Sequence, residues 1–250
     1  MAERIGKRLA HAGIASRREA ERLILDGRVE VNGETLTTPA VTVDADDVVK
    51  VDGERIGQRP GLRVWKMWKP EGTVVTRKDE RGRPTVFDIL PEDMPHVVAV
   101  GRLDMNSEGL LLLTNDGELS RWLELPETGW ARRYRVRVHG HPNEAMVKKL
   151  KAGMTVEGVR YGPIDTTIDT QNGANAWMTM TLREGKNREI RHALAELNLK
   201  VNRLLRTAYG PFQLGAMKRG KFEEIPPKML REQLGGRWAD RIDANRRRKA

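Results

Sequence analysis

The chemistry of this sequence centres on residues 101–116, which read GRLDMNSEGLLLLTND. Asp104 stands two positions after Arg102 and shortly before four consecutive leucines, a run typical of a buried strand. Alternate positions of an extended chain point to one side, so Arg102 and Asp104 can face the same cleft. A carboxylate held beside a guanidinium stays ionised and oriented, which suits a nucleophile rather than a general acid.

Two interpretations of Asp104 stay open on these residues alone. An aspartate after a strand is more often a turn or capping residue, because its side chain bonds the local backbone. A second group of cations favours the catalytic interpretation: Arg188 and Arg191 stand three residues apart at the start of a predicted helix. Residues at that spacing share one helix face, so both guanidinium groups can be directed at one acid.

Other classes of active site lack their sequence signatures. The five histidines do not have the spacing of a metal-binding motif, and His139 and His141 have no carboxylate beside them. The glycine-rich stretches match neither a phosphate-binding loop nor a dinucleotide fingerprint, and no serine nucleophile elbow is present. Zero cysteines exclude thiolate metal sites and cysteine nucleophiles. We therefore predict neither a metal ion nor a cofactor.

The composition points to a nucleic-acid partner. The 250 residues carry a net charge of +10 and a pI near 10.0, and 38% of them are hydrophobic. Such a chain commonly binds nucleic acid, although a merely basic globular protein is the alternative. No apolar run approaches membrane-spanning length, and the first residues lack the apolar stretch of a signal peptide. We expect a soluble, cytoplasmic and monomeric protein with no membrane association.

Residues 1–56 are predicted to form a small RNA-binding unit of two helices and a short sheet. Apolar side chains recur at helical spacing over residues 5–12. Ser16 and Glu19 form a capping box that starts a second helix, and Asn-Gly at 32–33 is a strong hairpin signal. The clustered arginines of the helices suit contact with phosphate, with a solvated helix face as the alternative.

This first unit closely resembles the alpha-L RNA-binding motif, over ERIGKRLAHAGIASRREAERLILDGRVEVNG. In that family the two helices and the following strand face structured RNA. The resemblance implies RNA contacts by Arg4, Lys7, Arg8, Ser16, Arg17, Arg18 and Arg28.

A second, larger domain is predicted after a short linker. Residues 57–62 are polar and rich in chain breakers, residues 63–230 mix strands and helices, and residues 231–250 read as a basic, disordered tail. The expected strands are residues 64–69, 73–76, 110–113, 133–138, 177–182 and 201–206, and residues 97–101 form a short apolar segment. The expected helices are residues 118–125, 143–151 and a segment after residue 188. The pattern predicts an α+β fold with a mixed, largely antiparallel sheet.

Several motifs of this second domain, in order, resemble the pseudouridine synthases of the RsuA/RluB/RluE/RluF group. They are KPEGTVVTR, GRPTVFDILP, GRLDMNSEGLLLLTNDGELS, RRYRVRV and EGKNREIRHALAELNLKVNRLLRTAYG, between residues 63 and 226. The resemblance implies that Asp104 is the catalytic nucleophile, that Tyr134 packs on the target base and that Arg191 pairs with Asp104. The alternation of Tyr134 with valines also permits an ordinary core tyrosine.

The same resemblance implies the substrate contacts. Arg102 would hold the flipped nucleotide, and Leu204 and Leu205 would wall the base pocket. Further cations on turns, loops and the helix start are predicted to contact the RNA, namely Lys69, Arg77, Arg83 and Arg188.

Pseudouridine formation detaches uracil from ribose and rejoins it through carbon five, so it needs no cofactor. The target base must leave its stack, at a cost of roughly a few kcal/mol that protein contacts offset. The motifs are most similar to the RluB type, which implies ribosomal RNA of the large subunit, or a pre-ribosomal particle, as the substrate. A related enzyme acting on small-subunit RNA and a non-catalytic ribosome-assembly factor are the alternatives.

Overall fold

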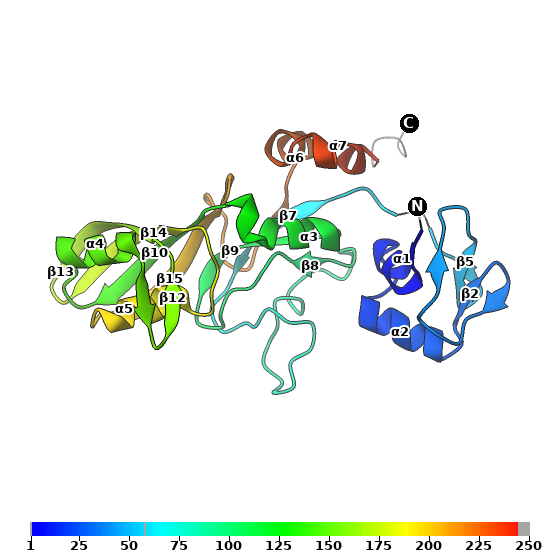
Figure 1. The fold of residues 1–250 in the computed structure, drawn as a ribbon, viewed down its shortest axis with the longest axis horizontal. Coiled ribbons are helices and arrows are strands. Elements are labelled where there is room, and N and C mark those ends of the chain that lie inside the picture. Colours follow the sequence, from blue (N-terminus) through cyan, green and yellow to red (C-terminus); the bar gives the residue numbers. More distant parts are fainter. Residues whose placement is uncertain (1, 58, 245–250) are drawn as a thin grey trace.

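The computed structural model describes residues 2–57 and 59–244, and it contains two domains side by side (Figure 1). The smaller domain begins with helices α1 (Ile5–His11) and α2 (Arg17–Leu25). The Ser16 hydroxyl accepts a hydrogen bond from the Glu19 amide at 3.2 Å, and the Glu19 side chain accepts one from the Ser16 amide at 3.0 Å. The predicted capping box is therefore confirmed.

A small sheet completes this domain. Its strands run in the order β3 (Glu34–Thr35), β2 (Val29–Val31), β5 (Val49–Val51) and β6 (Glu54–Arg55), and β1 (Glu3–Arg4) pairs separately with β4 (Thr42–Val43). Asn32 and Gly33 both have positive φ, at 53° and 90°, and form the predicted β2–β3 hairpin turn. The helices bury Ile5, Leu9 and Ile24 against this sheet.

The larger domain is built on one mixed sheet. Its strands run in the order β13 (Asp165–Asn172), β14 (Asn175–Leu182), β10 (Arg132–His139), β15 (Lys200–Tyr209), β9 (Glu108–Thr114), β7 (Val64–Lys69) and β17 (Phe222–Glu224), with β8 (Val98–Ala99) beside β9 and β16 (Phe212–Gln213) beside β15. Of the described strands, only β9 and β15 pair in parallel. This confirms the predicted α+β fold with a largely antiparallel sheet.

The two halves of this sheet have separate cores. Around β10 and β14, the even-numbered side chains of β10, including Tyr134 and Val136, pack with α4 (Glu144–Ala152) and α5 (Glu189–Glu196). Around β9, Leu110 and Leu112 pack with α3 (Gly117–Glu124), while Leu111 and Leu113 face the opposite side. Both faces of the sheet are therefore covered around β9.

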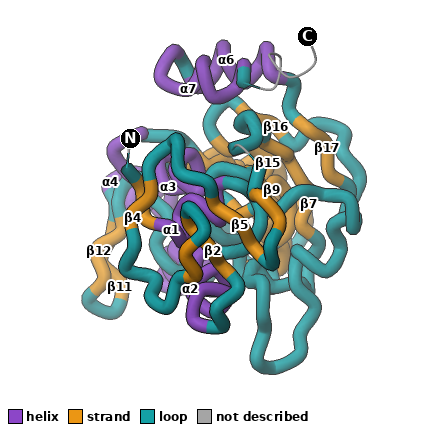
Figure 2. Tube along the Cα trace, turned by 90° about the vertical axis from the view of Figure 1, so that its right-hand side faces the viewer, coloured by secondary structure: helices purple, strands orange, loops and turns teal. Residues whose placement is uncertain are grey.

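The C-terminal region differs from the prediction. Residues 231–243 are not a disordered tail, because α6 (Pro227–Leu234) and α7 (Gly236–Asp243) pack on the β9 core through Leu230, Trp238 and Ile242. The two helices form a layer of their own beside β7 and α3 (Figures 1 and 2). The basic cluster over 245–250 lies outside the described residues.

Some local elements were predicted wrongly or missed. Residues 73–76 form no strand: within this described segment only Val74 makes an isolated bridge, to Thr85. The hairpin of β11 (Met154–Val156) and β12 (Val159–Tyr161), the edge strand β13 and the late strand β17 were not predicted. A short 3-10 turn, η1 (Pro126–Thr128), links α3 to the region before β10.

Candidate active site

Asp104 lies on a short loop that enters β9. The Ser107 amide donates to the Asp104 carbonyl oxygen at 3.0 Å, which makes the loop a tight turn. Two residues beyond Ser107, Gly109 has φ +104°, and a Cβ atom there would lie 2.3 Å from the Arg206 carbonyl oxygen. Only glycine permits this approach of β9 to β15, so the strand pairing fixes where the loop emerges.

A buried cation, Lys69, holds the backbone of the Asp104 loop. Lys69, at the end of β7, is fully buried, and its Nζ atom donates to the carbonyl oxygens of Ser107 at 2.8 Å and Pro70 at 3.0 Å. The predicted contact of Lys69 with RNA is therefore wrong, because the side chain has no access to a ligand. Burial lowers the pKa of Lys69 to about 8, although the nearby Asp104 carboxylate opposes this effect.

Two cavities meet at Asp104. A wide cleft of about 1880 Å³ runs between the two domains, and a smaller pocket of about 350 Å³ opens from it into the sheet. Arg102, Leu103, Asp104 and Arg188 line both. The smaller volume lies within the range of small-ligand pockets, about 300–1,000 Å³, so the Asp104 carboxylate stands where a small group that enters from the cleft could reach it.

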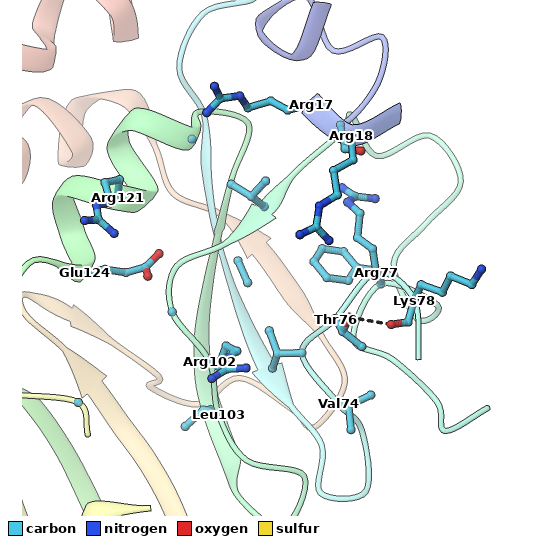
Figure 3. Close-up of a pocket in the computed structure, with 18 of the residues that line it drawn as sticks. Arg17, Arg18, Val74, Thr76, Arg77, Lys78, Arg102, Leu103, Arg121 and Glu124 are labelled. Carbon is cyan, nitrogen blue, oxygen red and sulfur yellow. Dashed lines mark hydrogen bonds between the residues drawn. The ribbon is translucent and has the colours of Figure 1, made fainter. Parts of the chain in front are cut away.

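The wide cleft is lined by cations from both domains. Arg17 and Arg18 come from α2, Arg121 from α3, Arg77 from the long loop after β7, and Arg102 from the Asp104 loop (Figure 3). Their side chains reach into the same open space from several directions (Figure 3). A positive groove of this kind attracts a phosphate backbone.

The smaller pocket carries an aromatic ring and an aliphatic wall. Tyr134, 9% exposed, and Leu204, 6% exposed, both line it. Leu205 does not, because neighbouring residues of β15 face opposite sides of the sheet and Leu205 packs with the β9 core instead. The predicted pocket wall is therefore wrong for Leu205, while Tyr134 and Leu204 both line the pocket.

The cation closest to Asp104 differs from the predicted one. The Nη1 atom of Arg188 lies 3.8 Å from the Asp104 Oδ2 atom. Arg191 instead donates to the carbonyl oxygens of Asn106 at 2.6 Å and Val201 at 3.4 Å, so it ties α5 to the Asp104 loop. Burial lowers the pKa of Arg191, and the Asp104 carboxylate opposes this effect from a longer range. The predicted direct pair of Arg191 with Asp104 is not formed.

The backbone explains why Arg188 is not part of the helix face that carries Arg191. Arg188 is the N-cap of α5 and adopts a left-handed conformation with φ 48° and ψ 27°. The prediction that both arginines share a helix face fails here, since Arg188 precedes the helix. A non-glycine residue in this region is uncommon and is found at functional sites.

Two predicted phosphate-binding arginines already have protein partners. An Nη atom of Arg77 donates to the Val97 carbonyl oxygen, and its guanidinium stacks 4.6 Å from the centre of the Phe87 ring. Arg83 forms an ion pair with Asp79 across 2.6 Å, which closes the loop on itself. Both side chains line the cleft, but their first role is to shape the long loop.

The predicted RNA contacts of the small domain separate into two classes. Arg4, Arg17 and Arg18 are exposed, and the last two line the cleft. The others have partners within the protein: Arg28 with Asp52, Lys7 with Glu118, Arg8 with Glu3 at 4.0 Å, and the Ser16 hydroxyl with the Glu19 amide. The Lys7–Glu118 pair, at 2.5 Å, joins α1 to α3 of the larger domain.

Several residues of the pocket escaped the sequence analysis. Arg206 is 2% exposed, lines the pocket, and donates through Nε to the Leu110 carbonyl oxygen at 2.6 Å. Glu184 and Glu189 line it as well, and Glu189 is 3% exposed. The alternation of side chains along β15 could have predicted Arg206 as a pocket residue, because Arg206 lies on the same strand face as Leu204.

Within residues 2–57 and 59–244, no group of three or more His, Cys, Asp or Glu side chains is placed to hold a metal ion. In the same part of the chain, no helix has the length and apolar character needed to cross a membrane.

Comparison with known proteins decides the family. The family model described as RNA pseudouridylate synthase matches residues 63–196, and the S4 domain model matches residues 3–49. The chain is an RNA pseudouridine synthase. The S4 match gives this synthase an RNA-binding domain beside its isomerase domain.

Similar curated proteins span nearly the whole synthase. An uncharacterized RNA pseudouridine synthase of Rickettsia prowazekii (strain Madrid E) is 41% identical over 231 residues, which cover 92% of this chain and 97% of that protein. The ribosomal large subunit pseudouridine synthase B of Pasteurella multocida (strain Pm70) is 41% identical over 243 residues, covering 93% of this chain and 70% of that protein. A crystal structure of a pseudouridylate synthase, 23% identical, shares the synthase fold with a TM-score of 0.67 over 93% of this chain and 99% of that one.

Proposed function

We propose that this synthase isomerises a uridine of large-subunit ribosomal RNA and that Asp104 is its nucleophile. One observation carries the proposal: of the two acids that line both the wide cleft and the smaller pocket, Asp104 has the Arg188 guanidinium 3.8 Å away, whereas Glu124 accepts a hydrogen bond from the Ser120 hydroxyl. A flipped uridine in the pocket would place its glycosidic bond near the carboxylate while its neighbours stay in the cleft. Tyr134 and Leu204 would stack on the base, and base–aromatic stacking is worth about 1 to 3 kcal/mol.

The choice of large-subunit RNA rests on similarity. Two further relatives, from Haemophilus influenzae and Yersinia pestis, are each 40% identical and are named as ribosomal large subunit pseudouridine synthase B. The Pasteurella protein has the same name. The exposed Arg17 and Arg18 of the S4 domain supply phosphate contacts that suit a structured RNA or a pre-ribosomal particle.

A map of pseudouridines in ribosomal RNA tests this proposal. We expect one large-subunit pseudouridine to disappear when the gene is deleted and to return when the parent protein is restored. Restoring Asp104→Asn at the same level should leave the site as uridine. A missing pseudouridine in small-subunit RNA would contradict the substrate, and an unchanged map together with a ribosome-assembly defect would favour the non-catalytic alternative.

A further inference from the structure

Two glutamates meet at the wall of the Asp104 pocket. Glu184, just after β14, and Glu189, at the start of α5, both line the pocket, and both contact the same residue, Lys186. Two ionised carboxylates repel and have no hydrogen to donate. A hydrogen bond between two neighbouring carboxyl groups therefore requires a proton on one of them.

The remaining contacts of the pair assign that proton. Glu184 accepts from the Gly162 amide at 2.5 Å and pairs with the Lys186 ammonium at 2.8 Å, so its environment favours the charged form. Glu189 accepts from the Lys186 amide at 3.2 Å through Oε2, while its buried Oε1 receives no hydrogen from the described protein. A proton on Oε1, donated to Glu184, satisfies both oxygens.

The two pKa values agree with this assignment. Burial raises the pKa of Glu189 to about 8, and the hydrogen bond and charge of Glu184 act in the same direction. Burial also acts to raise the pKa of Glu184, but the bonds from Lys186 and the Gly162 amide outweigh it, so that pKa is lowered. These two directions favour a state near pH 7 in which the pair holds one proton and one negative charge.

The pair holds the loop that carries Arg188. Lys186 is bound twice, through its amide to Glu189 and through its ammonium to Glu184. Arg188 follows two residues later in its left-handed conformation, and its guanidinium lies 3.8 Å from Asp104. A shift of the loop would move that cation away from the carboxylate.

We propose that Glu184 and Glu189 share one proton and that this pair positions Arg188 beside Asp104, which makes Glu189 a positioning residue of the synthase. The inference rests on the proposed role of Asp104. Loss of the shared proton leaves two negative charges in contact at a buried site, which separates the carboxyls and loosens the loop. The rate of isomerisation then falls as Glu189 ionises.

Other charged and titratable groups surround the pair. Tyr161 of β12 lies beside Lys186 and bonds His192 of α5. The pocket that the two glutamates line also contains Arg102, Asp104, Glu124, Arg132, Tyr134, Lys186, Arg188, Arg206 and Tyr209. Lys69, on the other side of Asp104, has a pKa of about 8 as well. The test must therefore distinguish ionisation of Glu189 from that of Lys69.

The pH profile of the single-turnover rate makes this distinction. Glu189→Gln keeps a donor for Glu184 and an acceptor for the Lys186 amide but cannot ionise. We expect the parent rate to fall above about pH 8. The Gln variant should keep a rate within about threefold of the parent at pH 7, and its rate should not decline up to about pH 9.5. Glu189→Ala should lose at least about tenfold at every pH. Glu196→Gln, an exposed change on the same helix, should retain the parent profile.

An infrared titration supplies a second measurement on the parent itself. The carbonyl band of a protonated carboxylic acid should be present at pH 7, disappear with a midpoint near pH 8, and be absent in Glu189→Gln. A parent protein without this band would overturn the proposal. A Gln variant that keeps the alkaline decline would also overturn it, and would assign the decline to Lys69. Turnover by Asp104→Asn would instead contradict the proposed function, so the two failures are distinguishable.

Discussion

Arg188 lies 3.8 Å from Asp104, whereas Arg191 bonds the carbonyl oxygen of Asn106 at 2.6 Å. The two arginines of the EGKNREIR motif therefore act on the same loop in different ways. Arg188 supplies the positive charge at the carboxylate, and Arg191 holds the backbone that presents it. The half-exposed Arg188–Asp104 pair is worth little to folding, about 0–1 kcal/mol.

This division predicts different effects of matched substitutions. Arg188→Gln should leave the melting temperature nearly unchanged and reduce the single-turnover rate more than about tenfold. Arg191→Gln removes the charge-assisted hydrogen bonds to the Asn106 and Val201 carbonyl oxygens, so it should cost about 1–3 kcal/mol of stability as well as activity. Urea unfolding and single-turnover kinetics measure both. An active Arg188→Gln beside a stable, inactive Arg191→Gln would restore Arg191 as the partner of Asp104.

One substitution, which removes a single oxygen atom, distinguishes the role of the Tyr134 hydroxyl from that of its ring. Tyr134→Phe keeps the ring on the apolar face of β10, so fold and RNA affinity should stay within about twofold of the parent. If the hydroxyl takes part in proton removal after the base has rejoined, turnover should fall by about 10²-fold or more, the usual size of such contributions. A Phe variant with the parent single-turnover rate would limit Tyr134 to stacking.

The sequence predicted the regular elements well, because their periodicity is strong. Strand β7 has the predicted bounds, and β10 extends the predicted strand by one residue at each end. Tyr134 alternates with valines there, and this pattern of period two admits only one buried face. The capping box likewise depends on residues three positions apart, so tertiary contacts are not needed to recognise it.

The errors arose where tertiary structure overrides local pattern. Helix α7 has a polar sequence, and only Trp238 and Ile242 reach the core, so composition alone resembled a tail. The left-handed backbone of Arg188 cannot be read from residue spacing. The wrong prediction for Leu205 was avoidable, because adjacent residues of a strand face opposite sides of the sheet and cannot both line one pocket. The burial of Lys69 could not be predicted, because its ammonium bonds the carbonyl oxygens of Met105 and Ser107, which are distant in the sequence.

The C-terminal helices should contribute to stability as part of the core. Trp238 is 2% exposed in α7 and packs against Trp122, with ring centres 5.8 Å apart. Trp238→Ala should cost about 3–5 kcal/mol, as for other buried aromatic side chains. Met229→Ala on α6, where Met229 is 46% exposed, is the control and should change stability by less than about 0.5 kcal/mol. Equal effects in denaturant melts would contradict the packing of α7.

Glu189 also predicts how folding stability varies with pH. Its pKa is raised from 4.5 to about 8 in the folded protein, so the folded state binds a proton that the unfolded chain has released. The stability from this proton is fully present below about pH 4.5 and is lost as the pH rises through 8. The difference in unfolding free energy between Glu189→Gln and the parent should therefore shift in favour of the variant from about pH 5 to 8. A constant difference would contradict the raised pKa.

The phosphate contacts that we propose for the S4 domain can be counted by their salt dependence. Arg17 and Arg18 are exposed and line the cleft, so each Gln variant should reduce the slope of log affinity against log salt by about 0.7–0.9 for each phosphate that the missing arginine neutralised. Arg55→Gln on β6, exposed and outside the cleft, is the control and should keep the parent slope. Equal slopes for all three variants would remove α2 from the RNA interface.

The central claim is that Asp104 performs the chemistry, and Asp104→Asn tests it most directly. Asn keeps the shape and turn-forming ability of Asp but cannot act as a nucleophile. The measurement is release of tritium from carbon five of uridine in ribosomal RNA by the purified variant, with Asp93→Asn as an exposed control. We predict a melting temperature within a few degrees of the parent, similar RNA affinity and no tritium release, while Asp93→Asn turns over normally. Tritium release by Asp104→Asn, with contaminating host enzyme excluded, would reduce Asp104 to a turn residue and contradict the account.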